Sequence, residues 1–304
     1  MRKRIKLFWI TFFIAIFSLS FIFENVNAVS FAPKELRLTL NANNTVTLPK
    51  NFRKTTDSDK IKDIDKSVNL EGMNKLNISG SGQFSEKGLE MAKENIGEKV
   101  PITVVDLREE SHGFLNGNAI SWTDGHNKAN KGLIEAQVIK DENERLKKLS
   151  EEKTVEIKNR TLNVEKVENE ENLTKKHGIS YTRITVTDKE APSKEAVDEF
   201  VNFAKSVPNS GWLHFHCKAG KGRTTTFMAM YDMMKNAKNV SFEDIIKRQF
   251  LLGGENLLKR TTVENIKGTR AKFLKNFYDY CRTNNDNFNT TWEQWLKNNP
   301  DNSR

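Results

Sequence analysis

The chain has 304 residues, of which 37% are hydrophobic and 29% charged, and its formal net charge at pH 7 is +9. This length allows one large domain or two small ones, and the composition is that of a soluble globular protein. The positive excess suits an anionic partner such as a phosphorylated small molecule. With only Cys217 and Cys281, the chain has no disulfide framework and no cysteine-based finger for nucleic acid, although a single bridge between the two remains an alternative.

Residues 1–28 have the pattern of a secretory signal, with basic residues before an apolar run over 7–23 and a small residue, Ala28, before a polar sequence. Cleavage after Ala28 would remove four basic groups and one acid, so the net charge falls from +9 to +6. We expect a secreted or cell-surface protein. The alternative is an uncleaved membrane anchor, because the run is long for a signal and short for a spanning helix.

We take the remaining chain, residues 29–304, as one domain. Its first half shows one strong strand. Residues 29–98 are polar with few periodic signals, and we expect them to wrap the core as extended segments. Residues 100–108, VPITVVDLR, predict a β-branched strand. The composition shifts between about 116 and 178, and within this range acidic and basic residues nearly alternate over 141–176. This pattern predicts a small inserted subdomain, partly helical and partly antiparallel strand.

Strands and helices alternate in the second half. Residues 178–186 and 211–217 predict strands, and a helix with one apolar face begins near Ala196. Helices are also predicted at 223–237, at 242–252 after a capping Ser241, at 268–282 and at 290–299. This order predicts an α/β fold in which helices cover a central sheet.

The stretch HFHCKAGKGRTTTF, residues 214–227, joins a predicted strand to a predicted helix through a glycine-bearing turn. A helix N-terminus presents unpaired N–H groups and partial positive charge, which stabilise a phosphate and also a thiolate. We therefore expect Cys217 to be a nucleophile, Arg223 to donate two hydrogen bonds to phosphate oxygens, Thr224 to donate to the departing sulfur, and His216 to hold the loop's shape. The phosphate would be cradled by the loop itself: Lys218, Ala219, Gly220, Lys221 and Gly222, with positive φ expected at both glycines.

The pattern over residues 216–224, His-Cys followed by five residues and then Arg-Thr, resembles the signature of protein-tyrosine-phosphatase-type cysteine phosphatases. VVDLREESHGFLNG, residues 104–117, together with LPKNFRKTTD near the N-terminus, is similar to the corresponding segments of the bacterial tyrosine-phosphatase-like inositol polyphosphatases, the cysteine phytases. This resemblance, over about residues 45–285, implies a tyrosine-phosphatase-like central sheet flanked by helices, with a small partial β-barrel subdomain.

A proton donor is needed because an alkoxide is a poor leaving group. Asp188 follows a predicted strand and precedes Pro192, and it lies where the family places its mobile general-acid loop. Lys189 and Ala191 depart from the histidine and the aromatic residue that family members often carry there. An ordinary turn aspartate is the alternative. No metal or other cofactor is expected, because the amides and Arg223 hold the transferring charge.

Cations around the loop favour a substrate with several phosphates. The lysines at 218 and 221 make the loop similar to that of the tumour-suppressor phosphoinositide 3-phosphatase. Arg53 matches a substrate contact of the phytase family, and Lys189, Lys267 and Arg270 are further candidates. Asp106 stands at the exit of a strand together with Arg108, Glu110 and His112; whether these four brace the loop or reach the substrate stays open.

The predicted function is hydrolysis of myo-inositol polyphosphates such as phytate through a cysteinyl-phosphate. The alternative is a phosphotyrosine, dual-specificity or phosphoinositide phosphatase acting on phosphoproteins or lipids. A non-catalytic phosphate-binding module would require a damaged nucleophile, arginine or acid, and all three are intact. We expect a small polyphosphate as the partner, no nucleic acid, and a membrane only if the N-terminal segment is not cleaved.

Overall fold

The computed structural model describes residues 36–64, 66–259 and 269–300. The predicted signal, residues 1–28, lies outside this part of the chain. None of the helices in the described ranges combines the length and apolar character that crossing a membrane requires.

The central sheet has five strands in the order β10-β4-β11-β3-β2, and all neighbours are parallel except β2, which pairs antiparallel with β3. The three strands predicted from the sequence are confirmed and lie side by side in this sheet. The five strands are β2 (Arg53–Lys54), β3 (Ile78–Gly82), β4 (Ile102–Arg108), β10 (Ser180–Val186) and β11 (Trp212–Cys217).

The expectation that residues 29–98 only wrap the core is wrong, because β3 is a fully buried strand next to β11. Its sequence, ISGSG, has few β-branched residues. Small residues are needed there because a Cβ on Gly80 would lie 2.5 Å from Met228 Sδ and 2.6 Å from Thr224 Cγ2, both on the helix α6 (Gly222–Asn236) that crosses the strand. The same region forms α1 (Ser58–Lys62), a 3-10 turn at Met73–Lys75 and α2 (Glu86–Ile96).

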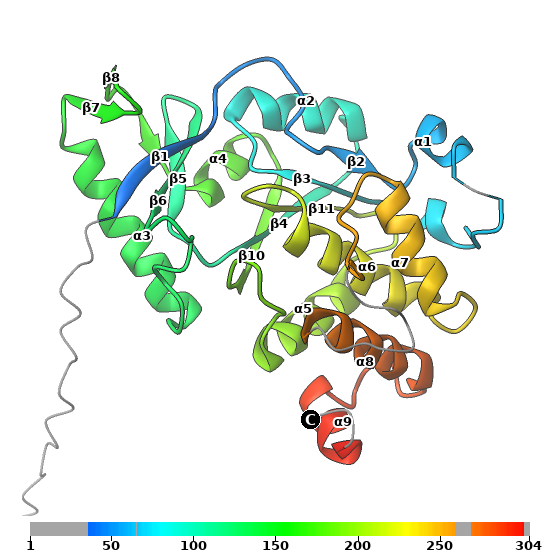
Figure 1. Ribbon diagram of the computed structural model, residues 1–304. Coiled ribbons are helices and arrows are strands. Elements are labelled where there is room, and N and C mark those ends of the chain that lie inside the picture. Colours follow the sequence, from blue (N-terminus) through cyan, green and yellow to red (C-terminus); the bar gives the residue numbers. More distant parts are fainter. Residues whose placement is uncertain (1–35, 65, 260–268, 301–304) are drawn as a thin grey trace, which may run out of the picture. The chain divides into compact units, whose positions relative to one another are not determined.

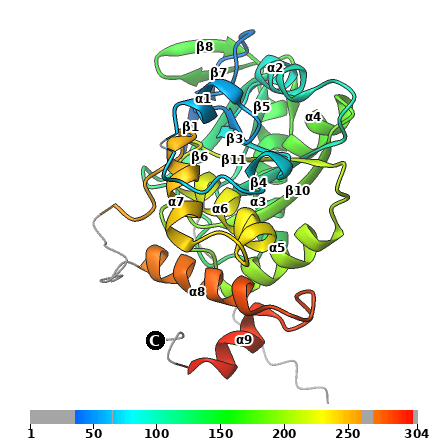
Figure 2. The same ribbon diagram turned by 90° about the vertical axis from the view of Figure 1, so that its right-hand side faces the viewer.

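The predicted helices of the second half are confirmed. Ser241 caps α7 by accepting a hydrogen bond from the Asp244 amide, as its sequence predicts. α6 packs between the sheet and both α7 and α8, and Figure 2 shows α8 with α9 beyond it. Besides α6, the helices of the second half are α5 (Lys194–Ser206), α7 (Phe242–Leu251), α8 (Thr269–Thr283) and α9 (Trp292–Asn298).

Alternation along β11 sends its side chains to two different environments. Leu213, Phe215 and Cys217 face the large core under the helices. Trp212 faces a second core, which includes Phe84 and residues of the inserted segment, and the His214 and His216 rings also contact Phe84. The nucleophile candidate and the histidine before it therefore lie on opposite faces of the sheet.

A second, antiparallel sheet has the order β1-β6-β5-β9, and it lies with α3 and the β7–β8 hairpin on the left of Figure 1. It extends beyond the predicted insertion at 116–178, because β1 comes from the N-terminal part and β5 begins at His112. The elements of this part are β1 (Arg37–Ala42), β5 (His112–Leu115), β6 (Asn118–Thr123), α3 (Glu135–Ser150), β7 (Thr154–Ile157), β8 (Arg160–Asn163), β9 (Val167–Glu168) and α4 (Glu170–Lys176).

Candidate active site

The loop between β11 and α6 begins after Cys217, the last residue of the strand, and ends at Gly222, the first residue of the helix. Gly220 has a φ of 71°, and a Cβ on it would lie 2.2 Å from the Gly82 backbone nitrogen. The positive φ expected at Gly222 is wrong, because this residue is already helical. Glycine is needed there for space: a Cβ would lie 2.9 Å from Arg270 Nη1.

Cys217 is buried, with 3% of its surface exposed, and it is a free thiol. Thr224 Oγ1 donates a hydrogen bond to its Sγ over 3.2 Å, as the sequence predicts. Burial favours the neutral thiol, but the Arg223 guanidinium and hydrogen bonds from Thr224 and the Gly220 backbone outweigh it, so the pKa of Cys217 lies below its ordinary value. The site therefore favours the nucleophilic thiolate.

Arg223 is fixed by a buried carboxylate. Its Nη1 donates to Glu110 Oε2 over 2.6 Å and to the Val186 carbonyl over 3.0 Å, and its Nη2 donates to Glu110 Oε1 over 2.9 Å. The Nε of Arg223 is buried and has no hydrogen-bond partner among the described residues. Both terminal nitrogens of Arg223 thus contact Glu110 while Nε remains available to an anion, a more detailed arrangement than the sequence predicted.

Asp188 lies two residues beyond β10, and its Oδ1 is 3.3 Å from Arg223 Nη2. Its Oδ2 accepts a hydrogen bond from Asn127 Nδ2 over 3.1 Å, and its side chain is 20% exposed. The predicted acid is therefore beside the predicted phosphate-binding arginine. Lys189, with a φ of 67°, is exposed in the same turn.

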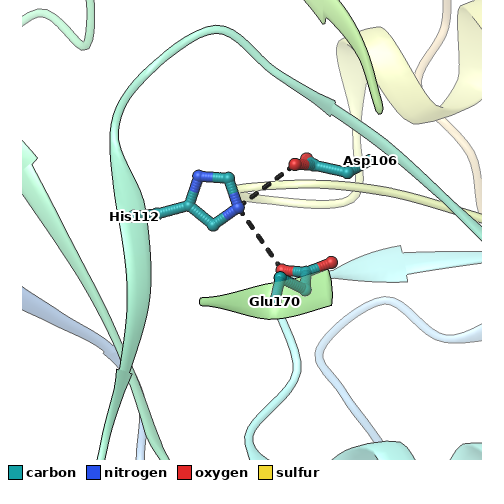
Figure 3. A group of neighbouring side chains, drawn as sticks. All are labelled: Asp106, His112 and Glu170. Carbon is teal, nitrogen blue, oxygen red and sulfur yellow. Dashed lines mark ion pairs between the residues drawn. The ribbon is translucent and has the colours of Figure 1, made fainter. Parts of the chain in front are cut away.

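His216 is fully buried, and its Nε2 lies 2.6 Å from Glu170 Oε1, at the start of α4. Figure 3 shows the neighbouring group, in which His112 Nε2 is 3.2 Å from Asp106 Oδ2 and 3.4 Å from Glu170 Oε2. Asp106, His112 and Glu170 bring ligand atoms within 4.8 Å of one another. Arg183 Nε also lies 3.4 Å from Asp106, so the carboxylates of this group already have cationic partners inside the protein.

The open question about Asp106 and its neighbours is settled by their burial. Asp106 has no exposed surface; it accepts hydrogen bonds from the Arg108 amide and from Tyr181 Oη. Of the two roles left open, the substrate contact for Asp106 does not fit, because its side chain belongs to the buried ion-pair group. Arg108 donates to Glu110 over 3.0 Å, and His112 is 1% exposed. All of them brace the loop.

Arg53 also supports the loop. It is 1% exposed, and its guanidinium donates to the Gly220 carbonyl over 2.8 Å and to Thr225 Oγ1 over 3.0 Å. Burial lowers the pKa of Arg53 to about 10, against the opposing effect of the Cys217 charge. The sequence predicted a direct substrate contact for Arg53; its burial and its hydrogen bonds instead place the guanidinium against the backbone of the loop.

Comparison with known proteins identifies the family to which this chain belongs. Residues 105–235 match the PTP-like phytase family, described as "Inositol hexakisphosphate". The chain is 32% identical to a PTP-like phytase from Bdellovibrio bacteriovorus, with a TM-score of 0.72, and the match covers 87% of this chain and 96% of that one. The chain belongs to the PTP-like phytase family.

Two longer relatives match this chain over only part of their own length. The tandemly repeated protein tyrosine phosphatase like phytase of Mitsuokella multacida is 36% identical, with a TM-score of 0.76, over 86% of this chain and 48% of that one. The effector protein hopD2 of Pseudomonas syringae is 33% identical over 80% of this chain and 56% of that protein. The chain thus spans about half the length of these two relatives.

The predicted substrate cations of this PTP-like phytase are only partly brought together. Lys218 Nζ donates to Asn127 Oδ1 over 2.7 Å, and Lys221 Nζ donates to the Gly253 carbonyl over 3.2 Å. Arg270 lies against Gly222, and its Nη2 donates to the Glu190 carbonyl over 2.9 Å, which ties α8 to the turn that carries the acid. Lys267 lies outside the described residues.

Three contributors of this phytase-family site were not found from the sequence: Asn127, which contacts the acid, Glu170, which contacts His216, and Gln83, which accepts from Arg108 over 2.6 Å. Their partners are 61, 46 and 25 residues away along the chain, so no local spacing connects them. Glu170 is further hidden because it is one of three glutamates in the short stretch VENEENLTKK, and nothing in the sequence distinguishes it from the other two.

Proposed function

We propose that the chain is a cysteine-dependent phosphatase that removes phosphate from myo-inositol polyphosphates. The observation that carries this proposal is the thiol of Cys217, whose pKa is lowered against its burial by Arg223, together with Asp188, whose Oδ1 lies 3.3 Å from Arg223 Nη2. A PTP-like myo-inositol phosphatase from Mitsuokella multacida, 36% identical to this chain, has been solved in complex with myo-inositol-(1,3,4,5)-tetrakisphosphate, which supports the substrate class.

The reaction proceeds in two balanced steps. The Cys217 thiolate attacks phosphorus, a sulfur–phosphorus bond forms, and the bond to the leaving oxygen breaks as Asp188 transfers its proton to that oxygen. Asp188, now a carboxylate, takes a proton from water, whose oxygen attacks phosphorus and releases inorganic phosphate and the thiolate. Arg223 and the loop amides stabilise the charge on the transferring group in both steps.

The test compares kcat/KM on inositol hexakisphosphate, a phosphotyrosine peptide and a soluble phosphoinositide under the same ionic conditions. We expect the inositol polyphosphate to be preferred. Cys217→Ser should abolish turnover of every substrate while binding persists, and Cys281→Ala, which alters the other buried thiol, should retain activity. A peptide preferred by orders of magnitude would replace the proposal with a tyrosine phosphatase, and turnover by Cys217→Ser would overturn the mechanism.

Asp188→Asn separates general-acid catalysis from a merely structural effect. The variant should lose about 10²- to 10⁴-fold in kcat on an inositol phosphate, whose alkoxide needs a proton, and much less on an aryl phosphate, whose phenolate leaves unaided. Equal losses on the two substrates would show that Asp188 is not the acid.

We also propose that residues 1–28 direct export and are removed after Ala28. The basic start, the apolar run and the small residue at the predicted cleavage point support this proposal. N-terminal sequencing of the protein secreted by a bacterial host should begin at Val29. Retention of the full N-terminus in the membrane fraction would instead favour an anchor.

A further inference from the structure

A pocket of about 570 Å³ lies beside the turn that carries the general acid. Thr187, Glu190 and Ala191 of this turn line the pocket, whereas Asp188 and the catalytic loop do not. Its other walls come from residues 131–135, before and at the start of α3, and from the first two turns of α5. The volume is in the range of sites that bind small molecules, and the pocket is separate from the reacting groups.

The charged lining of this acidic pocket consists of five glutamates and one lysine: Glu109, Glu135, Glu190, Glu195, Glu199 and Lys131. Two of the glutamates have partners inside the protein. Glu190 lies 2.7 Å from Lys131 Nζ, and Glu195 is hydrogen-bonded to its own amide and to Ser193 at the N-terminus of α5. The other three, Glu109, Glu135 and Glu199, form no ion pair within the described ranges. Their charges are left for a ligand.

Glu109 is an enclosed carboxylate of the pocket. It follows β4 directly, and 7% of its surface is exposed. Its Oε2 is buried and has no hydrogen-bond partner among the residues that the structure describes. Burial raises the pKa of Glu109, although a hydrogen bond from Thr187 opposes this effect. A buried carboxylate costs free energy unless it is paired, so a cation in the pocket would stabilise its ionised form.

The separation of the carboxylates selects the kind of cation. A divalent metal needs ligand oxygens that converge at about 2–2.6 Å from one point. Within the described residues, the groups that could converge in this way do not include the three unpaired glutamates. The remaining lining is largely apolar: Leu133, Ile134, Val186, Ala191 and Ala196. Separate carboxylates beside an apolar wall match ammonium groups that are joined by methylenes, because the methylenes leave water while each ammonium keeps a carboxylate.

We propose that the acidic pocket binds a linear organic polycation, an aliphatic diamine or a longer polyamine. Glu109, Glu135 and Glu199 bind its ammonium groups, and the apolar residues contact its methylenes. The net charge of the whole chain is +9, so attraction of a polycation must come from a local site such as this one. The inference goes beyond the proposed function and does not depend on it: if the chain failed to hydrolyse inositol hexakisphosphate, the site would stand.

The test is calorimetric titration of the substrate-free protein with spermine, a linear polyamine, at low ionic strength. The double variant Glu135→Gln, Glu199→Gln removes two carboxylates of the pocket and leaves the catalytic groups unchanged. We expect its Kd for spermine to be about tenfold higher than that of the unaltered chain, and this difference to shrink as salt is added. Undetectable binding to the unaltered chain, or the same Kd in the double variant, would overturn the inference.

The matched control removes two exposed carboxylates that do not line the pocket, by Glu94→Gln on α2 and Glu144→Gln on α3. It changes the net charge by the same amount, so its Kd for spermine should equal that of the unaltered chain, and the Tm of each double variant should show that it is folded. Equal losses in the two double variants would mean that only net charge matters, against the inference.

Mg²⁺ is the second probe. Its Kd should not differ between the pocket variant and the control, because the unpaired glutamates do not converge on one ion. A Kd for Mg²⁺ that rises in the pocket variant alone would identify a metal site and overturn the assignment to an organic polycation.

The pH dependence of binding tests the same carboxylates independently. Burial, followed by the charge of Glu135, raises the pKa of Glu199 to about 7. A bound ammonium favours the ionised carboxylate, so the unaltered chain should bind spermine more tightly as pH rises from about 6 to about 8, where alkylammonium groups stay charged. The pocket variant should show a smaller change, and a Kd of the unaltered chain that is independent of pH would contradict the inference. The other charged groups that line the pocket around Glu199 are Glu109, Glu135, Glu190, Glu195 and Lys131.

Discussion

Thr224→Ala tests how the nucleophile is kept ionised. Thr224 Oγ1 donates the only side-chain hydrogen bond to Cys217 Sγ within the described residues, over 3.2 Å, and a donor to a charged group favours the ionised form. A hydrogen bond to a charged group contributes about 1.5–3 kcal/mol, and a long bond to sulfur should be at or below the lower end. With about 1.4 kcal/mol for each pKa unit, we expect the thiol pKa to rise by about one unit.

The assay is the pH dependence of inactivation by iodoacetamide, which reports the thiolate fraction of Cys217. Cys281 does not interfere, because its burial raises its pKa well above the ordinary value. Thr226→Ala is the matched control, since Thr226 Oγ1 donates to the Gly222 carbonyl over 2.8 Å and not to the sulfur. A titration midpoint that is the same in Thr224→Ala and Thr226→Ala would refute the reasoning.

Two further predictions concern the loop and the buried charges. Gly220→Ala should abolish activity, because the added Cβ would lie 2.2 Å from the Gly82 nitrogen. Gly178→Ala is the control and should retain activity, because Gly178 has a similar φ of 68° but open space around it. Equal activities of the two variants would show that the loop tolerates a side chain. The His112 pKa is raised to about 9, because Asp106 and Glu142 together outweigh burial and Arg108. The stability that the charged His112 provides is present below about pH 6.5 and is lost as pH rises through 9. Urea unfolding should therefore show the free energy of unfolding decreasing by about 3 kcal/mol over that pH range. The decrease should be absent in His112→Gln. Both proteins are compared in the Cys217→Ser background, because the lowered pKa of the Cys217 thiol changes stability with pH in the opposite direction. An unfolding free energy that does not change with pH in the protein that keeps His112 would contradict the prediction.

The sequence was sufficient where chemistry and spacing are local. Cys217, Arg223 and Thr224 lie within eight residues on one strand–loop–helix unit, so their roles follow from the geometry of a helix N-terminus. Asp188 was predicted from its position after a strand together with the family resemblance, and the structure places it beside Arg223.

The predictions that went wrong depended on packing between distant segments. β3 escaped notice because Gly80 is required by the close approach of α6 and Gly82 by that of the catalytic loop, contacts that a single strand's sequence does not show. Arg53 carries the charge of a substrate contact, yet it pairs with the Gly220 carbonyl 167 residues away. Charge alone therefore predicted that a cation would be near the phosphate loop but not whether it would face the ligand or the backbone.

The inserted segment and the central sheet are energetically one unit, because they share buried charges. Arg183 on β10 donates to Glu142 of α3 over 3.0 Å, and His216 contacts Glu170 of α4. Removing the insertion would take Glu142 away from the buried Arg183 and leave only Asp106 as its carboxylate partner, and loss of one partner of a buried pair costs about 3–5 kcal/mol. That is a large fraction of the roughly 5–15 kcal/mol that stabilises a domain. His216, the residue preceding the nucleophile, is therefore held by a residue of the inserted segment, so the shape of the catalytic loop depends on that insertion.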